Sequence, residues 1–563
     1  MASPPLLIFG IDSATLTLVA PWIEQGELPT LGRLARTGAV GRLWSVPNMI
    51  TPPAWTTFAT GCNPGKHGIF YFTERVGGSY EERFIKGAAR TMPPFWMLLS
   101  EAGVRTTVLN VPMTYPADPV AGLMVSGMDA PGVEASGFTH PPELGNELLA
   151  RFGELVGPGS LSGAIGHLML AGRYDAALEV LERRVELRTA LARYLLERTP
   201  VDVFALVHTE VDGVQHYFWR FIDPRVPGYS ARAALRYGNA ILRLYRKVDR
   251  SLHELMQAMG EPRVIVMSDH GAGASPGPED GVPWIRLVLE EMGLAVPRVE
   301  RNGLARAGRR TVAAAYRALN PRLPGPLRRT LRRAFPGARR VAKRSVKYQY
   351  DWPRTRAFCL GAAGDVWLNV RGRDPHGVVE PGAEYERLRS FIRDTFLTLR
   401  DAVTGERVVE GVFYREEVYH GPFVERAPDL IIRFSDTVVR GVIVRGKTLR
   451  LPRRRASRPK EVKSGSHRPD GLVIFSGAGV ASGAVLNDAH LEDIAPTILY
   501  WMDQPVPTYM DGRVLSEAFT PEHRATLPLR AVERYVHSVP REAGYSPEET
   551  AVVLERLRGL GYV

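Results

Sequence analysis

The stretch LLIFGID, residues 6–12, decides the fold class of this chain. Its apolar run is too short for a typical helix and has the composition of a strand that is buried on both faces of a sheet. Asp12 follows at the point where such a strand leaves the sheet. Six further runs of the same kind recur along the sequence: TTVLNV (106–111), VFALVH (203–208), RVIVMS (263–268), VWLNV (366–370), DLIIRF (429–434) and GLVIFSG (471–477).

Segments with helical periodicity alternate with these strands. Their apolar residues recur at spacings of three and four, and several of them end at glycine. The segments are residues 29–38, 94–103, 233–260, 385–401 and 490–502. This alternation predicts an α/β fold with a mostly parallel central sheet flanked by helices, and with helical insertions. In such a sheet the functional side chains lie at the carboxyl ends of the strands.

The chain divides into four predicted parts, namely residues 1–300, 301–350, 351–519 and 520–563. The first and third parts hold the strands and together form the core. The second part is basic, has broken helical periodicity and is predicted to be an insertion. Residues 131–198 within the first part are mainly helical and form either a cap or a layer of crossover helices. In the helical tail, Ser546 and Glu549 have the spacing of a capping box.

The composition is that of a folded globular protein, with 45% hydrophobic and 23% charged residues among 563. The formal net charge is +12, and the excess is concentrated in residues 301–347 and 440–468. Such segments attract polyanions, an anionic membrane surface or phosphorylated substrates. The alternative, arginine-rich faces that are simply solvated, is about equally consistent with the sequence.

Cysteine content and the N-terminus bear on the cellular compartment. The two cysteines, Cys62 and Cys359, exclude a disulfide framework and a zinc site built of thiolates. The N-terminal sequence lacks the basic region of a signal peptide, and no stretch reaches the roughly 18 apolar residues of a membrane span. We therefore expect a cytoplasmic protein without a transmembrane segment.

Thr51 is the candidate nucleophile. It precedes two prolines and an apolar helical pattern in ITPPAWTTFATGCNPGKHGIF, residues 50–70. Proline is favourable in the first turn of a helix, so Thr51 is predicted to lie at a helix N-terminus. There the helix dipole favours an alkoxide and a phosphoryl group, although an ordinary threonine N-cap has the same pattern.

Carboxylates and imidazoles follow other predicted strands. Asp212 and His216 are four residues apart after VFALV, so they share one face of a helix, with His208 and Glu210 as nearby competitors. An Asp-His pair, residues 269 and 270, leaves the strand VIVM before a glycine. His467 lies in a loop rich in glycine, serine and proline just before a further strand.

Each of these signals alone is also typical of a structural residue, but all of them fall beside predicted strand ends. Oxygen and imidazole donors without thiolates suit two divalent cations, with zinc favoured and manganese or iron as alternatives. The candidate site comprises Asp12, Thr51, Asp212, His216, Asp269, His270 and His467.

The ordered set of motifs resembles the type I phosphodiesterase and nucleotide pyrophosphatase family of the alkaline phosphatase superfamily. The resemblance runs from FGID through TPPAWTTFATGCNPGKHGIF, VHTEVDGVQH, MSDHG and SGSHRPDG to DIAPTILYWMDQPVPTYMDGRVL. It implies an alkaline-phosphatase-like fold and metal-dependent hydrolysis of a phosphate ester through a phosphothreonine intermediate at Thr51. One metal would be bound by Asp212, His216 and His467. The other would be bound by Asp12, Asp269 and His270, with Thr51 Oγ as its fourth ligand.

Two departures from the family leave the substrate open. Ala54 stands where nucleotide pyrophosphatases tend to have an asparagine three residues after the nucleophile, and Pro52 has no N–H to offer a phosphate oxygen. Lys66 and His67 are interpreted as part of a structural turn, with contact to substrate as the alternative. Other readings are a phosphomonoesterase, a phosphonate hydrolase, a phosphomutase, and a non-catalytic protein that binds polyanions or membrane surfaces. A sulfatase is disfavoured because TPPAW lacks the formylglycine-forming motif.

Overall fold

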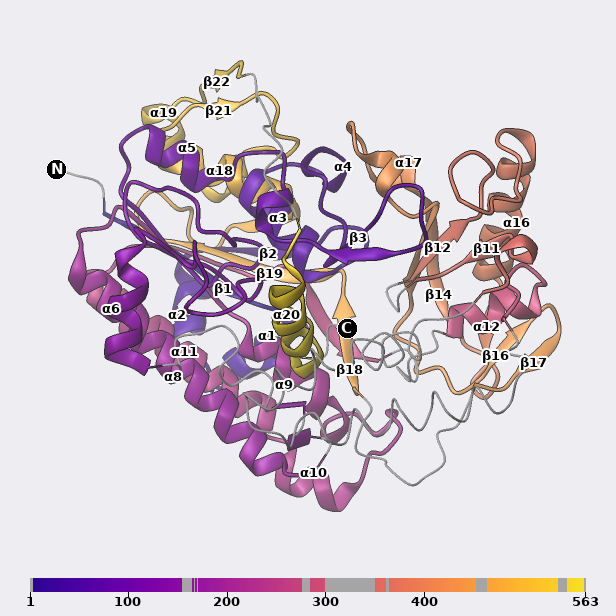
Figure 1. Cartoon of the computed structure of the whole chain (residues 1–563). Helices are drawn as coiled ribbons and strands as arrows, with labels where there is room; N and C mark the ends of the chain where they lie inside the picture. Colours follow the sequence, from indigo (N-terminus) through magenta and orange to yellow (C-terminus); the bar gives the residue numbers. More distant parts are fainter. Residues whose placement is uncertain are drawn as a thin grey trace.

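The computed structural model describes residues 4–153, 165–166, 168–169, 171–275, 284–298, 350–360, 364–451, 463–534 and 544–560. Figure 1 shows a large α/β body and, beside it, a smaller body that holds a second sheet. The predicted insertion 301–350 lies almost wholly outside the described residues, as does part of the basic segment 440–468. Their proposed partners therefore remain a prediction, and so does the division of the chain into parts.

A nine-stranded sheet forms the centre of the larger body, in the order β20-β2-β19-β9-β1-β8-β5-β6-β7. Its strands are β1 (Leu6–Ile11), β2 (Ala39–Trp44), β5 (Thr106–Leu109), β6 (Met124–Val125), β7 (Thr139–His140), β8 (Val203–His208), β9 (Arg263–Met267), β19 (Asp470–Ser476) and β20 (Val485–His490). β1 pairs in parallel with both β8 and β9, and β5 pairs in parallel with β8 and β6. Because only β19 and β7 run antiparallel to their neighbours, the expected mostly parallel sheet is confirmed.

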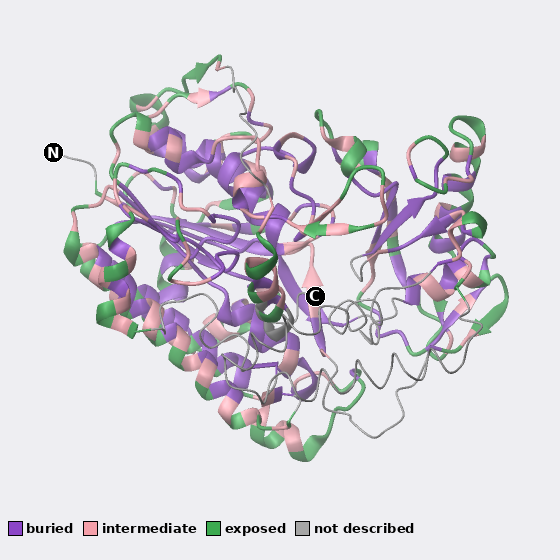
Figure 2. Cartoon of the chain, viewed as in Figure 1, coloured by how far each residue is buried: buried purple, intermediate pink, exposed green. Residues whose placement is uncertain are grey.

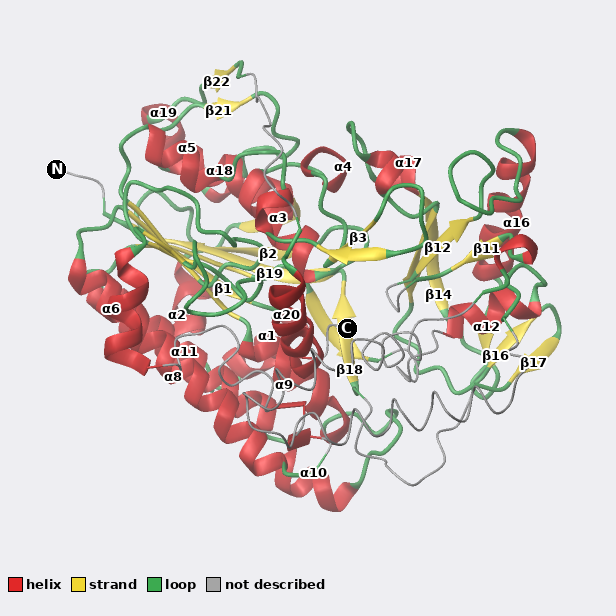
Figure 3. Ribbon diagram, in the orientation of Figure 1, coloured by secondary structure: helices red, strands yellow, loops and turns green. Residues whose placement is uncertain are grey.

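Helices cover both faces of this sheet (Figure 3). Leu7 and Phe9 of β1 face one apolar core while Leu6 and Ile8 face the other, as the alternation of side chains along a strand requires. The first core is covered by α1 (Leu16–Glu24), α2 (Pro29–Thr37), α6 (Glu143–Phe152), α8 (Tyr174–Arg198), α9 (Glu210–Phe218) and α11 (Ala240–Ala258). The second is covered by α3 (Thr51–Thr60), α5 (Phe95–Glu101) and α18 (Ile494–Trp501). Figure 2 shows the sheet as the buried layer between them.

Two of the predicted strands lie in a different sheet. VWLNV and DLIIRF contribute to β12 (Asp365–Leu368) and β15 (Leu430–Phe434), which pair antiparallel with each other. β11 (Ala357–Phe358) and β14 (Val409–Tyr414) complete this four-stranded sheet, whose core includes residues of α12 (Trp284–Glu291) and α16 (Ala383–Leu397). An apolar run predicts that a strand is buried but not which strands it pairs with. The sequence analysis therefore assigned all of these runs to one sheet.

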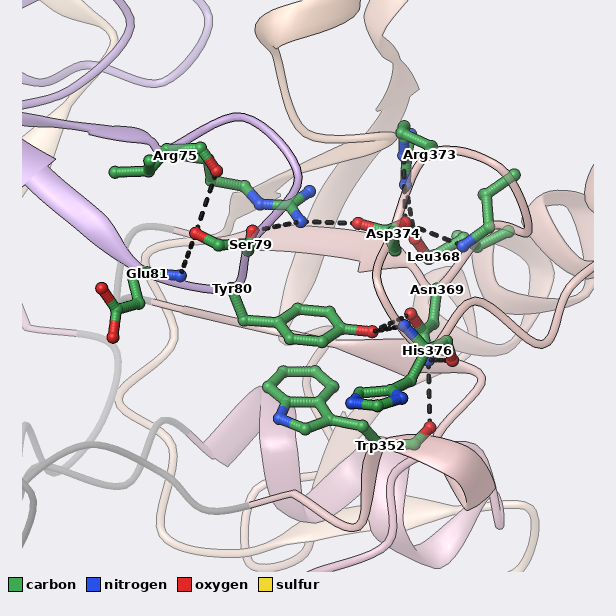
Figure 4. A network of polar contacts seen from close by, with 12 residues as sticks. Arg75, Ser79, Tyr80, Glu81, Trp352, Leu368, Asn369, Arg373, Asp374 and His376 are labelled. Carbon is green, nitrogen blue, oxygen red and sulfur yellow. Dashed lines mark hydrogen bonds and ion pairs between the residues drawn. The ribbon is translucent and has the colours of Figure 1, made fainter.

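A hairpin joins the two bodies. It consists of β3 (Thr73–Arg75) and β4 (Glu82–Phe84), and its tip reaches the second sheet (Figure 4). The Tyr80 ring stacks on Trp352 with centroids 3.5 Å apart, and its hydroxyl donates to Asn369 Oδ1 at 2.6 Å. Arg75 donates to Asp374 at 2.5 Å. The hairpin that follows α3 in the sequence is thus fixed to the second sheet.

Further short α-helices and strands lie between these elements. They are α4 (Pro64–His67), α10 (Ala231–Tyr237), α17 (Arg415–Val418), α19 (Pro521–Thr526), β10 (Gly271–Ala274), β13 (Arg400–Asp401), β16 (Val442–Val444), β17 (Lys447–Leu449), β18 (Gly465–Arg468), β21 (Val506–Pro507) and β22 (Ala531–Val532). The tail ends in α20 (Pro547–Leu560). Ser546 N donates to Glu549 Oε2 at 2.8 Å and Glu549 N to Ser546 Oγ at 3.2 Å, which confirms the capping box. No helix among the described residues combines the length and apolarity needed to cross a bilayer.

Candidate active site

The ends of two adjacent parallel strands bring Asp12, Asp269 and His270 together. Asp12 directly follows β1, and the Asp-His pair lies between β9 and β10. Because β1 and β9 pair in parallel, with Gly10 opposite Met267, their carboxyl ends meet at one edge of the sheet. His270 Nε2 lies 3.2 Å from Asp269 Oδ2 and 3.8 Å from Asp12 Oδ1.

A second group forms between α9 and β18. Asp212 and His216 share one face of α9 as their spacing predicts, with Asp212 Oδ1 3.2 Å from His216 Nε2. His467 Nε2 approaches the same carboxylate oxygen at 3.4 Å. The sequence placed His467 in a loop, but it lies in β18, where it pairs opposite Ala272 of β10. Pairing with β10 holds this polar segment as a strand although it carries no apolar pattern.

The two groups adjoin. The rings of His270 and His467 stack with centroids 3.9 Å apart. Two sets of three side chains, each with its ligand atoms within 4.8 Å of one another, could hold a cation, and Asp212 belongs to both. The sets are Asp212, His216 and His467, and Asp12, Asp212 and His270. The assignment that the resemblance implies differs in two respects: it gives each carboxylate to one metal, and it includes Asp269, which lies in neither set although His270 Nε2 is 3.2 Å from its Oδ2.

Thr51 is the first residue of α3, at the helix N-terminus that the sequence predicts. One turn later, Trp55 Nε1 donates to Asp12 Oδ2 at 3.3 Å. Two residues before Thr51, the Met49 carbonyl accepts from His467 Nδ1 at 2.7 Å, if that nitrogen carries the proton. Contacts on either side of Thr51 therefore tie its segment to one residue of each group.

The turn after α3 is built from structural contacts. Lys66 Nζ donates to the Tyr509 carbonyl at 2.8 Å and pairs with Asp511, while His67 Nε2 lies 3.0 Å from Thr57 Oγ1. Burial lowers the pKa of His67 to about 3, so this imidazole is neutral. These contacts support the interpretation of residues 63–68 as a structural turn.

The buried carboxylates repel one another in the absence of a cation. Burial, followed by the charge of Asp269, raises the pKa of Asp12 well above its ordinary value, and burial likewise raises the pKa of Asp269. Burial also acts to raise the pKa of Asp212, but His216 and His467 hold that pKa well below its usual range. Burial lowers the pKa of His270. Burial therefore disfavours the charged forms of Asp12 and Asp269 in the absence of a cation, and a bound cation would favour the carboxylates because its charge offsets theirs.

The donor atoms of the site fit a divalent cation. Among the described residues, three buried atoms at the strand ends have no hydrogen-bond partner: Asp12 Oδ1, Asp269 Oδ2 and His270 Nε2. Leaving buried polar atoms without partners is costly, and a bound cation would satisfy all three. Oxygen and imidazole donors are the set expected for zinc, manganese or iron.

Sequence reasoning missed two supporting residues. Trp55 follows Thr51 at helical spacing, so its place on the same face of α3 could have been read from the sequence. Ser13 adopts a positive φ of 68° and donates its N–H to Asp269 Oδ1 at 3.1 Å. Nothing in the sequence marks this turn, because the bond joins residues 256 positions apart.

A buried ionic cluster supports the N-terminus of α9. Glu210 accepts from Arg188 at 2.5 Å, lies 3.3 Å from Arg184, and meets His208 Nδ1 at 3.3 Å. Burial acts to raise the pKa of Glu210, yet Arg188 and His208 hold it well below its ordinary value. His208 and Glu210, the competing ligands by sequence, therefore pair with each other and with α8. They fall in neither set of candidate ligands.

Glu210→Gln is expected to lower the free energy of unfolding by about 3 kcal/mol, because it leaves two arginines facing a buried site without a countercharge. Urea unfolding measures the loss. The matched control is Asp175→Asn, which removes the exposed pair with Arg236 and is expected to change stability by less than about 1 kcal/mol. Equal losses in the two variants would contradict a role for the cluster in holding α9.

Comparison with known proteins gives a family match and several similar structures. A sequence model described as type I phosphodiesterase / nucleotide pyrophosphatase matches residues 6–440. Phosphonoacetate hydrolase from Sinorhizobium meliloti 1021 is a similar solved structure, with 16% identity, a TM-score of 0.47, and coverage of 88% of this chain and 94% of that chain. Murine ectonucleotide pyrophosphatase / phosphodiesterase 5 is another, with 11% identity, a TM-score of 0.46, and coverage of 89% and 96%. No curated protein matches the sequence significantly.

The family match spans most of the chain and includes the segments that carry Asp12, Thr51, Asp212 and His270. His467 lies beyond its end and joins the site through β18. The protein is a hydrolase of phosphoric esters and belongs to the type I phosphodiesterase / nucleotide pyrophosphatase family.

Proposed function

We propose that the protein is a metal-dependent phosphodiesterase that works through a phosphothreonine intermediate at Thr51. The observation that carries the proposal is the convergence of carboxylates and imidazoles from β1, β9, α9 and β18 beside the N-terminus of α3. Thr51 Oγ is buried without a hydrogen-bond partner among the described residues. This is expected for a hydroxyl that contacts a metal or a substrate.

Thr51 Oγ loses its proton to solvent and forms a bond to phosphorus, while the leaving oxygen departs on the opposite side with the electron pair of its bond and takes up a proton from water. Water then attacks phosphorus, and the threonine hydroxyl is released. The N-terminus of α3 favours the negative charge that develops here. Since Pro52 and Pro53 carry no N–H, this contribution comes from the helix dipole and not from their amides.

Two residues orient the reacting groups. Trp55 holds one oxygen of Asp12, which leaves Oδ1 available on the side of His270. The Met49 carbonyl fixes the ring of His467 through Nδ1, so that Nε2 faces Asp212. Both contacts also set the position of Thr51, because both belong to its own segment.

Two divalent cations, with zinc favoured, would supply Lewis-acid stabilisation of the phosphoryl charge. The proposed ligands are Asp212, His216 and His467 for one cation and Asp12, Asp269, His270 and Thr51 for the other. Asp212 belongs to both candidate sets, so it could serve either cation.

Relative turnover of a diester and a monoester tests the substrate class. We expect kcat/KM for bis-p-nitrophenyl phosphate to exceed that for p-nitrophenyl phosphate, because the family model that matches residues 6–440 is that of a phosphodiesterase. The measurement follows p-nitrophenolate release by the metal-loaded protein. A preference for the monoester would favour the phosphomonoesterase or phosphomutase alternative, and turnover of a phosphonate alone would favour a phosphonate hydrolase.

A further inference from the structure

The C-terminal helix α20 docks beside the segment that carries Thr51. Val553 and Leu557 are buried, with 2% and 1% of their surface exposed, in a cluster with Phe72 and Met128. Ile50, the residue immediately before Thr51, packs against the same cluster. In Figure 1, α20 crosses the front of the larger body below α3. The helix thus helps to cover the side of the site where the proposed nucleophile lies.

Polar contacts fix the start of this helix. The Tyr545 hydroxyl donates to the Asp129 carbonyl at 2.8 Å, and the Tyr115 hydroxyl donates to Glu549 Oε1 at 3.2 Å. The two tyrosine rings lie nearly parallel, with Lys86 Nζ about equally close to both, at 5.8 and 6.0 Å from their centroids. The tail therefore docks through defined contacts on the loops that follow β5 and β6.

Thr51 is enclosed in this arrangement. Its exposed surface is 0%, although its hydroxyl must meet a phosphorus atom for the proposed reaction. The two main cores are formed by the central sheet and the helices that cover it. Val553 and Leu557 instead belong to a small separate cluster, so α20 can leave without opening either main core.

We propose that α20 is the outer wall of the substrate site and that its docking limits the size of the phosphoester that reaches Thr51. The inference rests on the proposed reaction at Thr51 and adds a specificity element to it. A small diester passes the docked helix, whereas a bulky diester reaches Thr51 poorly until α20 is displaced.

The test compares two diesters with the same leaving group, methyl p-nitrophenyl phosphate and 1-naphthyl p-nitrophenyl phosphate. The variant Val553→Asp/Leu557→Asp places two charges in the buried face of α20. Val552→Asp is the matched control, because Val552 is the adjacent residue and is 47% exposed. Hydrogen exchange of the amides of residues 548–557 reports whether the helix has undocked.

In the double variant, the ratio of kcat/KM for the naphthyl diester to that for the methyl diester is expected to rise by roughly tenfold or more, since a steric limit acts on the larger substrate. The control should retain the wild-type ratio and slow exchange. An unchanged ratio with fast exchange would overturn the proposal. An equal loss of activity on both diesters would also overturn it, because it would indicate that α20 only stabilises the fold. If the double variant does not fold, Tyr115→Phe/Tyr545→Phe removes the two hydroxyl donors that anchor the start of the helix, and the same two outcomes decide.

If the proposed reaction at Thr51 is wrong, the same experiments give a different result. If the wild-type protein hydrolyses neither diester, or if Thr51→Ala hydrolyses both as fast as the wild type, the proposed function is wrong whatever α20 does. If Thr51→Ala is inactive and the ratio does not respond to undocking, the reaction stands and only the role of the helix is lost.

Discussion

Thr51→Ala is expected to lower the rate of diester hydrolysis by roughly 10⁴-fold or more, because it removes the oxygen that would form the proposed covalent intermediate. The substitution deletes a hydroxyl that has no hydrogen-bond partner among the described residues, so the fold should tolerate it. The measurement is p-nitrophenolate release by wild type and variant at equal metal content.

Thr60→Ala is the matched control for this prediction. Thr60 lies on the same helix, is equally buried, and donates its hydroxyl to the Thr56 carbonyl at 2.7 Å. Its loss should leave the rate close to that of the wild type. Residual activity of Thr51→Ala near the control level would exclude Thr51 as the nucleophile, and so would a labelled phosphoenzyme that forms equally in both variants.

Asp212→Asn is expected to lower both bound metal and activity, with activity falling by roughly 10³-fold or more as the Lewis-acid contribution is lost. Asparagine keeps the shape of the side chain but not the charge that faces His216 and His467 at 3.2 and 3.4 Å. Elemental analysis after gel filtration gives the metal content. Chelation of the wild type should remove activity, and adding zinc, manganese or iron identifies the metal that restores it.

Asp249→Asn provides the comparison for Asp212. Asp249 is also a buried carboxylate, but its two oxygens accept from the N–H groups of Thr30 and Leu31 at 3.1 and 2.8 Å, so its substitution removes one of these bonds and leaves both sets of candidate ligands intact. Metal content and activity should therefore persist in this variant. Full metal content in Asp212→Asn would refute the assignment of this residue as a metal ligand.

The convergence of the site could be predicted because it depends on few facts. Asp12 and the Asp269–His270 pair each follow a buried strand, and the carboxyl ends of parallel strands meet at one edge whatever their order. The spacing of Asp212 and His216 fixes them on one helical face. These signals are local in sequence, and the sheet brings them together.

The remaining features depend on contacts between distant segments. β18 carries His467 but has no apolar pattern, and its strand conformation comes from pairing with β10. The place of Asp212 in both candidate sets follows from the separation of α9 and β1, which spacing does not determine. The second sheet was likewise missed, because runs such as VWLNV have the same pattern in either sheet.

The hairpin with Tyr80 at its tip makes the threonine-bearing helix and the second sheet a single mechanical unit. Only residues 61–72 separate the end of α3 from β3, and Tyr80 is held by Trp352 and Asn369. Exchanging loops of the second sheet in order to engineer new selectivity would therefore disturb the segment that follows α3 as well. Such a redesign succeeds only if the socket around Tyr80 is kept.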